Sequence, residues 1–297
     1  MPDDDTPLTA RVTSTLLGRE KSVKDPRVFH AVSLVAFFAW VGLGADGLSS
    51  SSYGPEEMFK ALGTHTSIAV ALAAAAALTV LVISLAYSRI IERFPFGGGG
   101  YVVATKLLGP SAGVVSGAAL MVDYVLTITT SVAAGADAIF SFLPPHLLQW
   151  KLLGEGLVIG LLVLLNLRGV KESVAVLTPI FLLFLLTHAV LLGGGVVVRG
   201  AELPQVAREV HQGLGRDLAT LGLGGVLALF LRAYSMGAGT YTGIEAVSNG
   251  LQIMREPRVQ TGKRTMVLMA TSLALTAAGV TLCYLLLAVS PAEGKTM

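Results

Sequence analysis

The stretch Gly42-Leu-Gly-Ala-Asp-Gly-Leu-Ser-Ser-Ser-Ser-Tyr-Gly-Pro-Glu-Glu57 decides how this chain folds. It follows an apolar run, Val28 to Leu43, and interrupts that run with glycines, one carboxylate, four serines and a proline. In hydrocarbon, unwound backbone survives only where it lines a protein cavity or binds something. A carboxylate at that depth costs roughly 2.5–3.5 kcal/mol on insertion scales, so Asp46 is a candidate functional residue. The alternative is a plain loop between a membrane helix and a soluble segment.

The composition places the chain in a bilayer. Of its 297 residues, 53% are hydrophobic and 13% are charged, whereas a soluble domain carries about 25% charged residues. The apolar residues lie in blocks of about 20, the length that a helix needs to cross the hydrocarbon core. We therefore expect an all-α integral membrane protein. The single cysteine, Cys283, allows no internal disulfide and no thiolate metal cluster. No nucleophile elbow or metal-ligand spacing is found, so we expect neither an enzyme, nor a resident cofactor, nor a nucleic-acid partner.

We predict membrane helices at 28–46 (broken, resuming to about 62), 66–88, 111–142, 153–168, 173–198, 221–250 (also broken) and 264–289. Lys and Arg gather before the first helix and after the second, fourth and sixth. By the positive-inside rule, this bias predicts a multi-pass protein of the cell inner (plasma) membrane whose N-terminal tail, residues 1–27, is cytoplasmic. Residues 199–220 are expected to form an extracellular loop. That loop should contain a short amphipathic helix, because Val206, Val210 and Leu214 recur at i, i+4 and i+8.

A second interruption lies in the sixth apolar segment, between Arg232 and Gly250. The breaks fall in the first and sixth helices, and a unit of five helices repeated in tandem arrives in the membrane upside down. Paired breaks at corresponding positions of inverted repeats are the best sequence pointer to a transporter's midplane site. Residues 28–198 are thus expected to be the first five-helix repeat, and residues 221–297 the start of a second. We assign the breaks to these glycines: Gly42, Gly44, Gly47, Gly237, Gly239 and Gly243.

The third helix supplies a polar stripe. Asp123, Thr127 and Ser131 recur at i, i+4 and i+8, with Tyr124 alongside, so they share one face of an otherwise apolar helix. Hydroxyl residues in membrane helices often bond only their own i−4 carbonyl. A second intramembrane carboxylate on the same stripe favours a pathway for a polar substrate.

Two further features have structural interpretations. The run Gly97–Gly100 lacks the G-x-x-x-x-G-K-[ST] pattern of a phosphate-binding loop, so we interpret it as a turn that allows close backbone approach. Arg232 precedes the second break, and we favour a structural pairing with a carboxylate such as Glu245, or with one contributed by the missing helices, over snorkelling to the outer surface.

Several motifs, taken in order, resemble one known family. They are the Gly42–Glu57 break, F-P-F-G-G-G-G-Y-V-V-A at 94–104, D-Y-V-L-T at 123–127, N-L-R-G-V-K-E-S at 166–173 and T-G-I-E-A at 242–246. Together they resemble the amino acid–polyamine–organocation superfamily, and within it the potassium-uptake permeases of the KUP type. The resemblance runs from about Val28 to Val289.

The resemblance implies a LeuT-type fold of two inverted five-helix repeats that drives substrate uptake with protons. It also implies that the ion path is bordered by these residues: Asp46, Tyr53, Asp123, Tyr124, Thr127, Ser131 and Thr242. The fold needs at least ten helices and about seven are predicted here, so the second repeat is incomplete. We expect the chain to be a fragment or a truncated reading frame.

Three functions follow, in order of preference. The first is proton-coupled potassium uptake, with K⁺ near Asp46, Tyr53 and Thr242 and with Asp123 as the proton carrier. The second is an amino acid or small organic-cation permease, in which Asp46 pairs with a substrate ammonium and the amides around Ser49–Ser52 bind its carboxylate. The third is a non-transporting fragment or sensor. The expected partners are the bilayer and a small cation or amino acid, and a homodimer is left open as an assembly.

Overall fold

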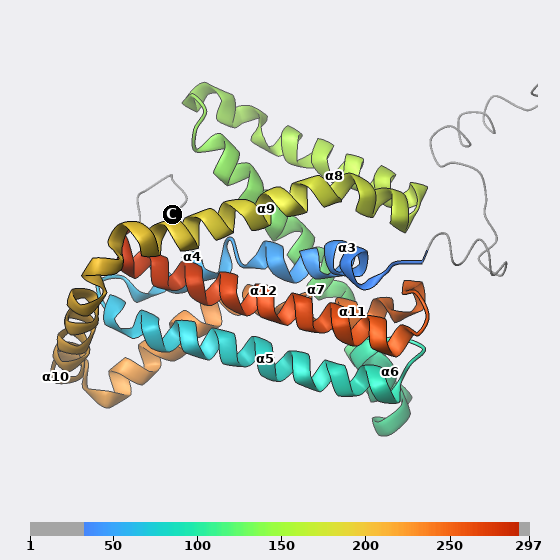
Figure 1. The fold of residues 1–297 in the computed structure, drawn as a ribbon, viewed down its shortest axis with the longest axis horizontal. Coiled ribbons are helices and arrows are strands. Elements are labelled where there is room, and N and C mark those ends of the chain that lie inside the picture. Colours follow the sequence, from blue (N-terminus) through green and yellow to red (C-terminus); the bar gives the residue numbers. More distant parts are fainter. Residues whose placement is uncertain (1–32, 291–297) are drawn as a thin grey trace, which may run out of the picture.

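The computed structural model describes residues 33–290, and the predicted cytoplasmic tail at 1–27 lies outside them (Figure 1). The described chain is almost entirely helical. Its helices are α3 (Ala36–Ser50), α4 (Gly54–Leu62), α5 (Ala69–Arg93), α6 (Gly99–Leu108), α7 (Pro110–Phe140), α8 (Lys151–Arg168), α9 (Val170–Arg199), α10 (Leu203–Met236), α11 (Ala246–Asn249) and α12 (Arg258–Leu286). Short 3₁₀ turns join several of them, among them η1 (Thr66–Ile68), η2 (Pro145–Trp150) and η4 (Ala238–Tyr241).

Among residues 33–290, five helical stretches are long and apolar enough to cross a membrane: Thr66–Arg93, Pro110–Phe140, Pro145–Arg168, Val170–Met236 and Arg258–Leu286. The protein is therefore a multi-pass membrane protein. The sequence predicts seven crossings, and the difference has two causes. The first segment is divided into α3 and α4, of 15 and 9 residues, each too short to be counted. The fifth and sixth predicted helices merge into one stretch, because a single 3₁₀ turn joins α9 to α10.

Helix α10 consists of two legs. Gly222, with φ 66° and ψ 171°, bends the chain between them. On the first leg Val206 and Val210 are half-buried and Asp217 is buried, whereas Leu214 is 37% exposed. The inward face thus passes through Asp217 and leaves out Leu214, which the sequence pattern had placed on it. The reason is polar: Asp217 accepts hydrogen bonds from the Ser67 hydroxyl at 2.5 Å and from Nδ1 of His65 at 2.7 Å.

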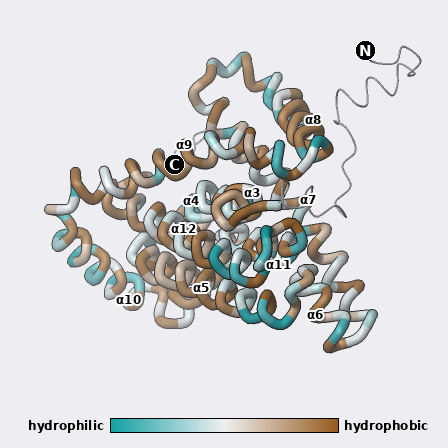
Figure 2. The backbone as a smooth tube through the Cα atoms, turned by 45° about the vertical axis from the view of Figure 1, so that its right-hand side comes forward, coloured by the Kyte–Doolittle hydropathy of each residue, from teal (hydrophilic) through white to brown (hydrophobic). Residues whose placement is uncertain are grey.

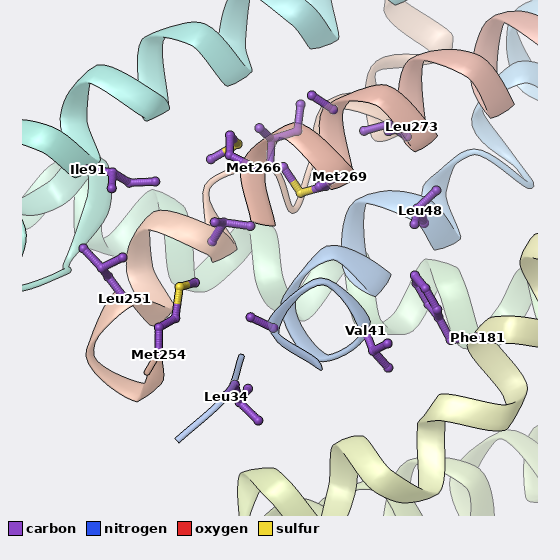
Figure 3. Close-up of a cluster of buried hydrophobic side chains, with 14 of the residues drawn as sticks. Leu34, Val41, Leu48, Ile91, Phe181, Leu251, Met254, Met266, Met269 and Leu273 are labelled. Carbon is purple, nitrogen blue, oxygen red and sulfur yellow. The ribbon is translucent and has the colours of Figure 1, made fainter. Parts of the chain in front are cut away.

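The main core surrounds α3, which packs between α9 and α12, while α5 lies on the other side of α12 (Figure 1). Figure 3 shows this core, in which Leu48 of α3, Phe181 of α9 and Met269 and Leu273 of α12 converge. Side chains from the segment after the second break, including Leu251 and Met254, complete it. This packing matters for function because it fixes the first interrupted segment against the second.

A backbone bridge joins the two interrupted segments at one end of this core. The Leu34 N–H donates to the Ile253 carbonyl at 2.9 Å, and the Arg255 N–H donates to the Leu34 carbonyl at 2.9 Å. The chain entering α3 is therefore bonded directly to the chain leaving the second break. Leu34 and Met254 are both buried at this point (Figure 3).

Helix α8 lies at the margin of the molecule (Figure 1), and helix α7 precedes it in the chain. None of the residues of α8, all of which the structure describes, is buried, and α7 buries only Gly113 and Thr127. Both helices are nevertheless largely apolar, as the brown colour in Figure 2 shows, whereas α11 and the first leg of α10 carry hydrophilic residues. Outward-facing apolar side chains are expected where the surroundings are hydrocarbon or further membrane helices.

Candidate functional site

The first interruption is shorter than the sequence predicts. Helix α3 continues through Gly42, Gly44 and Gly47 to Ser50, and the chain leaves the helix only at 51–53. The three glycines were assigned to the break, but the structure places them inside the helix, where they let neighbours approach closely. A Cβ atom on Gly42 would lie 2.5 Å from Val174 Cγ2, and one on Gly47 would lie 3.4 Å from Leu273 Cδ2.

Hydroxyls of the serine run bond the backbone near the end of α3. Ser49 and Ser50 donate to the main-chain carbonyl of Asp46 at 2.8 and 3.2 Å. Ser51 donates to the Leu48 carbonyl at 2.7 Å, and Ser52 to the Ser49 carbonyl at 2.6 Å. The four serines thus satisfy themselves locally, as hydroxyl side chains in apolar helices commonly do.

The second interruption is a true loss of helix. Gly237 ends α10, Gly239 lies in the 3₁₀ turn η4, and Thr242 is extended, with φ −71° and ψ 155°. Gly243 then has φ 81°, a left-handed conformation that favours glycine. The chain becomes α-helical again only at Ala246.

The two interruptions touch each other. A Cβ atom on Gly243 would lie 2.7 Å from Cγ and 2.8 Å from Oδ2 of Asp46, so the carboxylate group lies directly against this glycine. Nearby, the hydroxyls of Ser50 and Thr242 are 3.4 Å apart, and Thr242 also donates to the Gly239 carbonyl at 2.8 Å. Three of the predicted site residues, Asp46, Thr242 and Gly243, are therefore brought together.

Tyr53 extends this contact toward α4. Its hydroxyl donates to the Ser50 hydroxyl at 3.4 Å, and its ring packs on Gly239, where a Cβ atom would lie 3.0 Å from Tyr53 Cε2. At the next position, a Cβ on Gly54 would overlap the Thr240 hydroxyl. The turn at 51–53 and the turn η4 therefore fit together through small residues on both sides.

The stripe on α7 is the least exposed face of that helix. Thr127 is buried, and Asp123, Tyr124 and Ser131 are half-buried, while most of their neighbours are exposed. Tyr124 is the member that bonds the second interrupted segment: its hydroxyl accepts a hydrogen bond from Asn249 Nδ2 at 2.7 Å. Ser131 lies two turns beyond Asp123 on the same face, and within residues 33–290 its buried hydroxyl has no hydrogen-bond partner.

Three carboxylates from three segments interact at this place. Asp46 of α3, Asp123 of α7 and Glu245 of the second interruption are near enough for their charges to interact. Tyr124 of α7 and Tyr87 of α5 are near enough to interact with Glu245 and Asp123. Glu245 was not among the predicted site residues, and Oε1 of its carboxylate is buried without a hydrogen-bond partner in the described chain.

The predicted pairing of Arg232 with Glu245 is not found. Arg232 is exposed, and no ion pair joins it to Glu245 in the part of the chain that the structure describes. The physical reason is position: Arg232 belongs to the last turns of α10, whereas Glu245 follows the whole of η4 and faces the other acids. Glu245 and Asn249 are four residues apart and are joined by a backbone hydrogen bond, so a second polar stripe was the signal in the sequence.

The glycine run behaves as expected. Gly97, Gly98 and Gly99 all have positive φ, and a Cβ atom on Gly97 would lie 3.1 Å from the main-chain oxygen of Asn249. The backbone before α6 therefore approaches the second interrupted segment closely. Gln252 Nε2 also donates to the Phe96 carbonyl at 2.8 Å, which ties the same two segments together.

The chemistry of the site is that of oxygen ligands and charge. Within residues 33–290, no group of three or more His, Cys, Asp or Glu side chains is close enough to hold a tightly coordinated metal ion. The groups that do converge are carboxylates, hydroxyls and main-chain carbonyls, which suit a weakly held monovalent cation or an ammonium group. Nothing in this set resembles a nucleophile with its base.

A sequence profile described as amino acid permease matches residues 29–294, which is most of the chain. The chain belongs to the amino acid permease family. It is therefore a transporter-family protein of the amino acid–polyamine–organocation superfamily and not an enzyme, as the sequence motifs indicate.

Two relatives of this permease family show different cargoes. Over 244 residues the chain is 33% identical to the potassium transporter KimA of Bacillus subtilis (strain 168). The aligned region covers 80% of this chain and 39% of that protein. Over 116 residues it is 27% identical to the low-affinity putrescine importer PlaP of Escherichia coli (strain K12), covering 39% of this chain and 25% of the importer. The chain thus spans well under half the length of the relatives it matches.

Proposed function

We propose that this chain holds the ion-path half of a proton-coupled potassium importer that works by alternating access. The observation that carries the proposal is the contact between the Asp46 carboxylate and Gly243, which places a negative charge where the two interrupted segments meet. A carboxylate there attracts a cation and repels the carboxylate of an amino acid substrate. The similarity to a potassium transporter over 80% of the chain agrees with this choice.

The neighbouring groups have distinct parts in this proposal. The hydroxyls of Tyr53 and Thr242 and the main-chain oxygens of the breaks supply neutral oxygen ligands around K⁺ near Asp46. Asp123 carries the proton, because its charge interacts with that of Asp46 and so senses whether a cation is bound. Thr127 and Ser131 continue the polar face along α7.

Glu245 is a second candidate for the proton. Its Oε1 is buried and lacks a hydrogen-bond partner in residues 33–290, and it interacts with both Asp46 and Asp123. Burial and nearby negative charges disfavour an ionised carboxylate, and binding a proton or a cation relieves both effects. In this scheme the three acids share fewer than three negative charges until a cation arrives.

The second candidate function is import of a small organic cation or amino acid. The similarity of part of the chain to a putrescine importer favours it. The same three carboxylates would also attract an ammonium group. Asp46 would then pair with the ammonium group, and for an amino acid the amides of the first break would bind the carboxylate.

We further propose that the N-terminus is cytoplasmic and that the membrane is the cell inner (plasma) membrane. The bias of Lys and Arg toward alternate connections supports this orientation. In this orientation residues 28–198 are the first repeat of a LeuT-type fold, residues 199–220 are outside the cell and residues 221–297 begin the second repeat. A homodimer remains a hypothesis for its assembly.

The test is uptake of labelled rubidium into membrane vesicles that contain the full-length parent protein. Uptake is measured with and without an inward proton gradient. Uptake driven by the gradient and lost in Asp46→Asn supports the proposal. Asp137→Asn is the matched control, because Asp137 is an exposed aspartate of α7 that pairs with Lys151. Uptake of labelled putrescine or amino acid without any rubidium flux would move the assignment to the second candidate.

A further inference from the structure

Asn249 joins three segments that are distant in the sequence. It ends α11, and its Nδ2 donates a 2.7 Å hydrogen bond to the hydroxyl of Tyr124 on α7. On its other side, its Oδ1 lies against Gly99, the first residue of α6, so closely that a Cβ atom on Gly99 would overlap it. The side chain of Asn249 is thus held between α7 and the glycine run before α6.

Gly99 is the residue that makes this position available. Its φ is 50°, a backbone angle that residues other than glycine rarely adopt. The space that a Cβ atom would fill is taken by the Asn249 amide. The next glycine, Gly100, has open contact only with the Tyr87 hydroxyl, 3.6 Å from its built Cβ. Both the backbone conformation at 99 and the packing of Asn249 therefore require glycine.

The bond from Asn249 also determines what the Tyr124 hydroxyl does. Because the oxygen of Tyr124 accepts from Nδ2, its own O–H proton is directed to another partner. Two acids lie beside this bond in the chain: Asp123 precedes Tyr124 on α7, and the Asn249 N–H donates to the Glu245 carbonyl one turn earlier. The Tyr124 proton is therefore directed away from Asn249 in a region that holds carboxylates.

We propose that Asn249 is a positioning residue of the transport site: it fixes the Tyr124 hydroxyl as a proton donor toward the three carboxylates. This inference rests on the proposed function, in which those carboxylates bind the transported cation. The family resemblance implies that Tyr124 borders the ion path. In this proposal its hydroxyl stabilises the acids in the arrangement that admits the cation. The glycine run before α6 acts through Asn249, since it provides the surface against which the amide is held.

The test is a double-mutant cycle on rubidium uptake with Asn249→Ala, Tyr124→Phe and the double variant. Each single change is expected to raise KM about tenfold, the size of one hydrogen bond to charged groups, with little change in the maximal rate. The double variant should show no more than the larger single effect, because both changes remove one bond. Gln252→Ala is the control: it removes the bond to the Phe96 carbonyl at the same interface without touching Tyr124, and its KM should be unchanged.

Two results overturn the proposal. One is additive effects of the two single changes on KM; the other is a lower maximal rate in Asn249→Ala with KM unchanged, which marks a purely structural role. A parallel cycle in the melting temperature of the purified protein needs no substrate. If the wild type imports neither rubidium nor putrescine, the proposed function fails, and the melting cycle alone then decides: coupled shifts support the Asn249–Tyr124 bond, and additive shifts overturn it.

Discussion

The carboxylate of Asp46 lies against the backbone of Gly243, with 2.8 Å between Oδ2 and the place where a Cβ would stand. One residue comes from the first interrupted segment and the other from the second. Since Gly243 also has φ 81°, both space and backbone conformation demand glycine there. This contact brings charge to the meeting point of the two segments.

Replacing Gly243 with alanine should displace the Asp46 carboxylate. The added methyl group has no room, and the positive φ adds strain of about 1 kcal/mol or more. We expect Gly243→Ala to reduce rubidium uptake at least tenfold while the protein still reaches the membrane. Gly224→Ala on α10 is the matched control, because no atom lies within 4 Å of its built Cβ. Equal uptake by the two variants would refute the importance of the contact.

Alanine at Gly99 should reproduce the effect of Asn249→Ala, because its Cβ takes the place of the Asn249 amide oxygen. The expected result is a rise in KM for rubidium, measured over a range of concentrations in vesicles. Gly100→Ala serves as the control, since its Cβ meets only the Tyr87 hydroxyl at 3.6 Å. A normal KM in Gly99→Ala would show that the glycine run does not act on the site.

Neutralising Glu245 should alter how uptake depends on pH. Glu245→Gln keeps the volume of the side chain but removes a charge that interacts with Asp46 and Asp123. If Glu245 shares the coupled proton, the gradient should no longer drive accumulation, although rubidium should still equilibrate across the vesicle membrane. Glu209→Gln, on the first leg of α10, is the control for loss of a carboxylate away from the site. Gradient-driven accumulation that persists in Glu245→Gln would assign the proton to Asp123 alone.

Asp217 should contribute to stability and not to transport chemistry. It is buried and bonded by His65 and Ser67, which ties the first leg of α10 to η1. Asp217→Ala leaves two polar partners unpaired and should cost about 1–3 kcal/mol, a fall in Tm of roughly 2–4 °C for each kcal/mol. Melting of the purified protein checks this. Glu209→Ala on the same leg should melt normally, and a Tm for Asp217→Ala as high as that would exclude the anchoring role.

The sequence was sufficient for the class of fold, which depends on a pattern that extends along the chain: apolar blocks of membrane length. An ion site near Asp46, Tyr53 and Thr242, inferred from the two interruptions and the family resemblance, stays a prediction. The same reasoning wrongly assigned Gly42, Gly44 and Gly47 to the break. A glycine that breaks a helix and a glycine that lets α3 approach Val174 or Leu273 look alike in a sequence, because the difference lies in the neighbour.

The roles of Asn249 and Glu245 were beyond such patterns for a related reason. Glu245 and Asn249 form a short polar stripe, but what each does depends on Tyr124 and Asp123, which lie more than a hundred residues earlier. Arg232 does not pair with Glu245: it is near Glu245 in sequence, yet η4 separates the two in space, and pairing with a carboxylate from the missing helices stays a prediction. Pairing by proximity in sequence fails where the chain leaves the helix.

The backbone bridge between Leu34 and the 253–255 strand-like segment has a mechanical consequence. It crosslinks the start of the first interrupted segment to the end of the second without using any side-chain atom, so substitutions at these positions leave its two hydrogen bonds in place. We expect both segments to move together during each transport cycle. Neither segment can then change its position without the other.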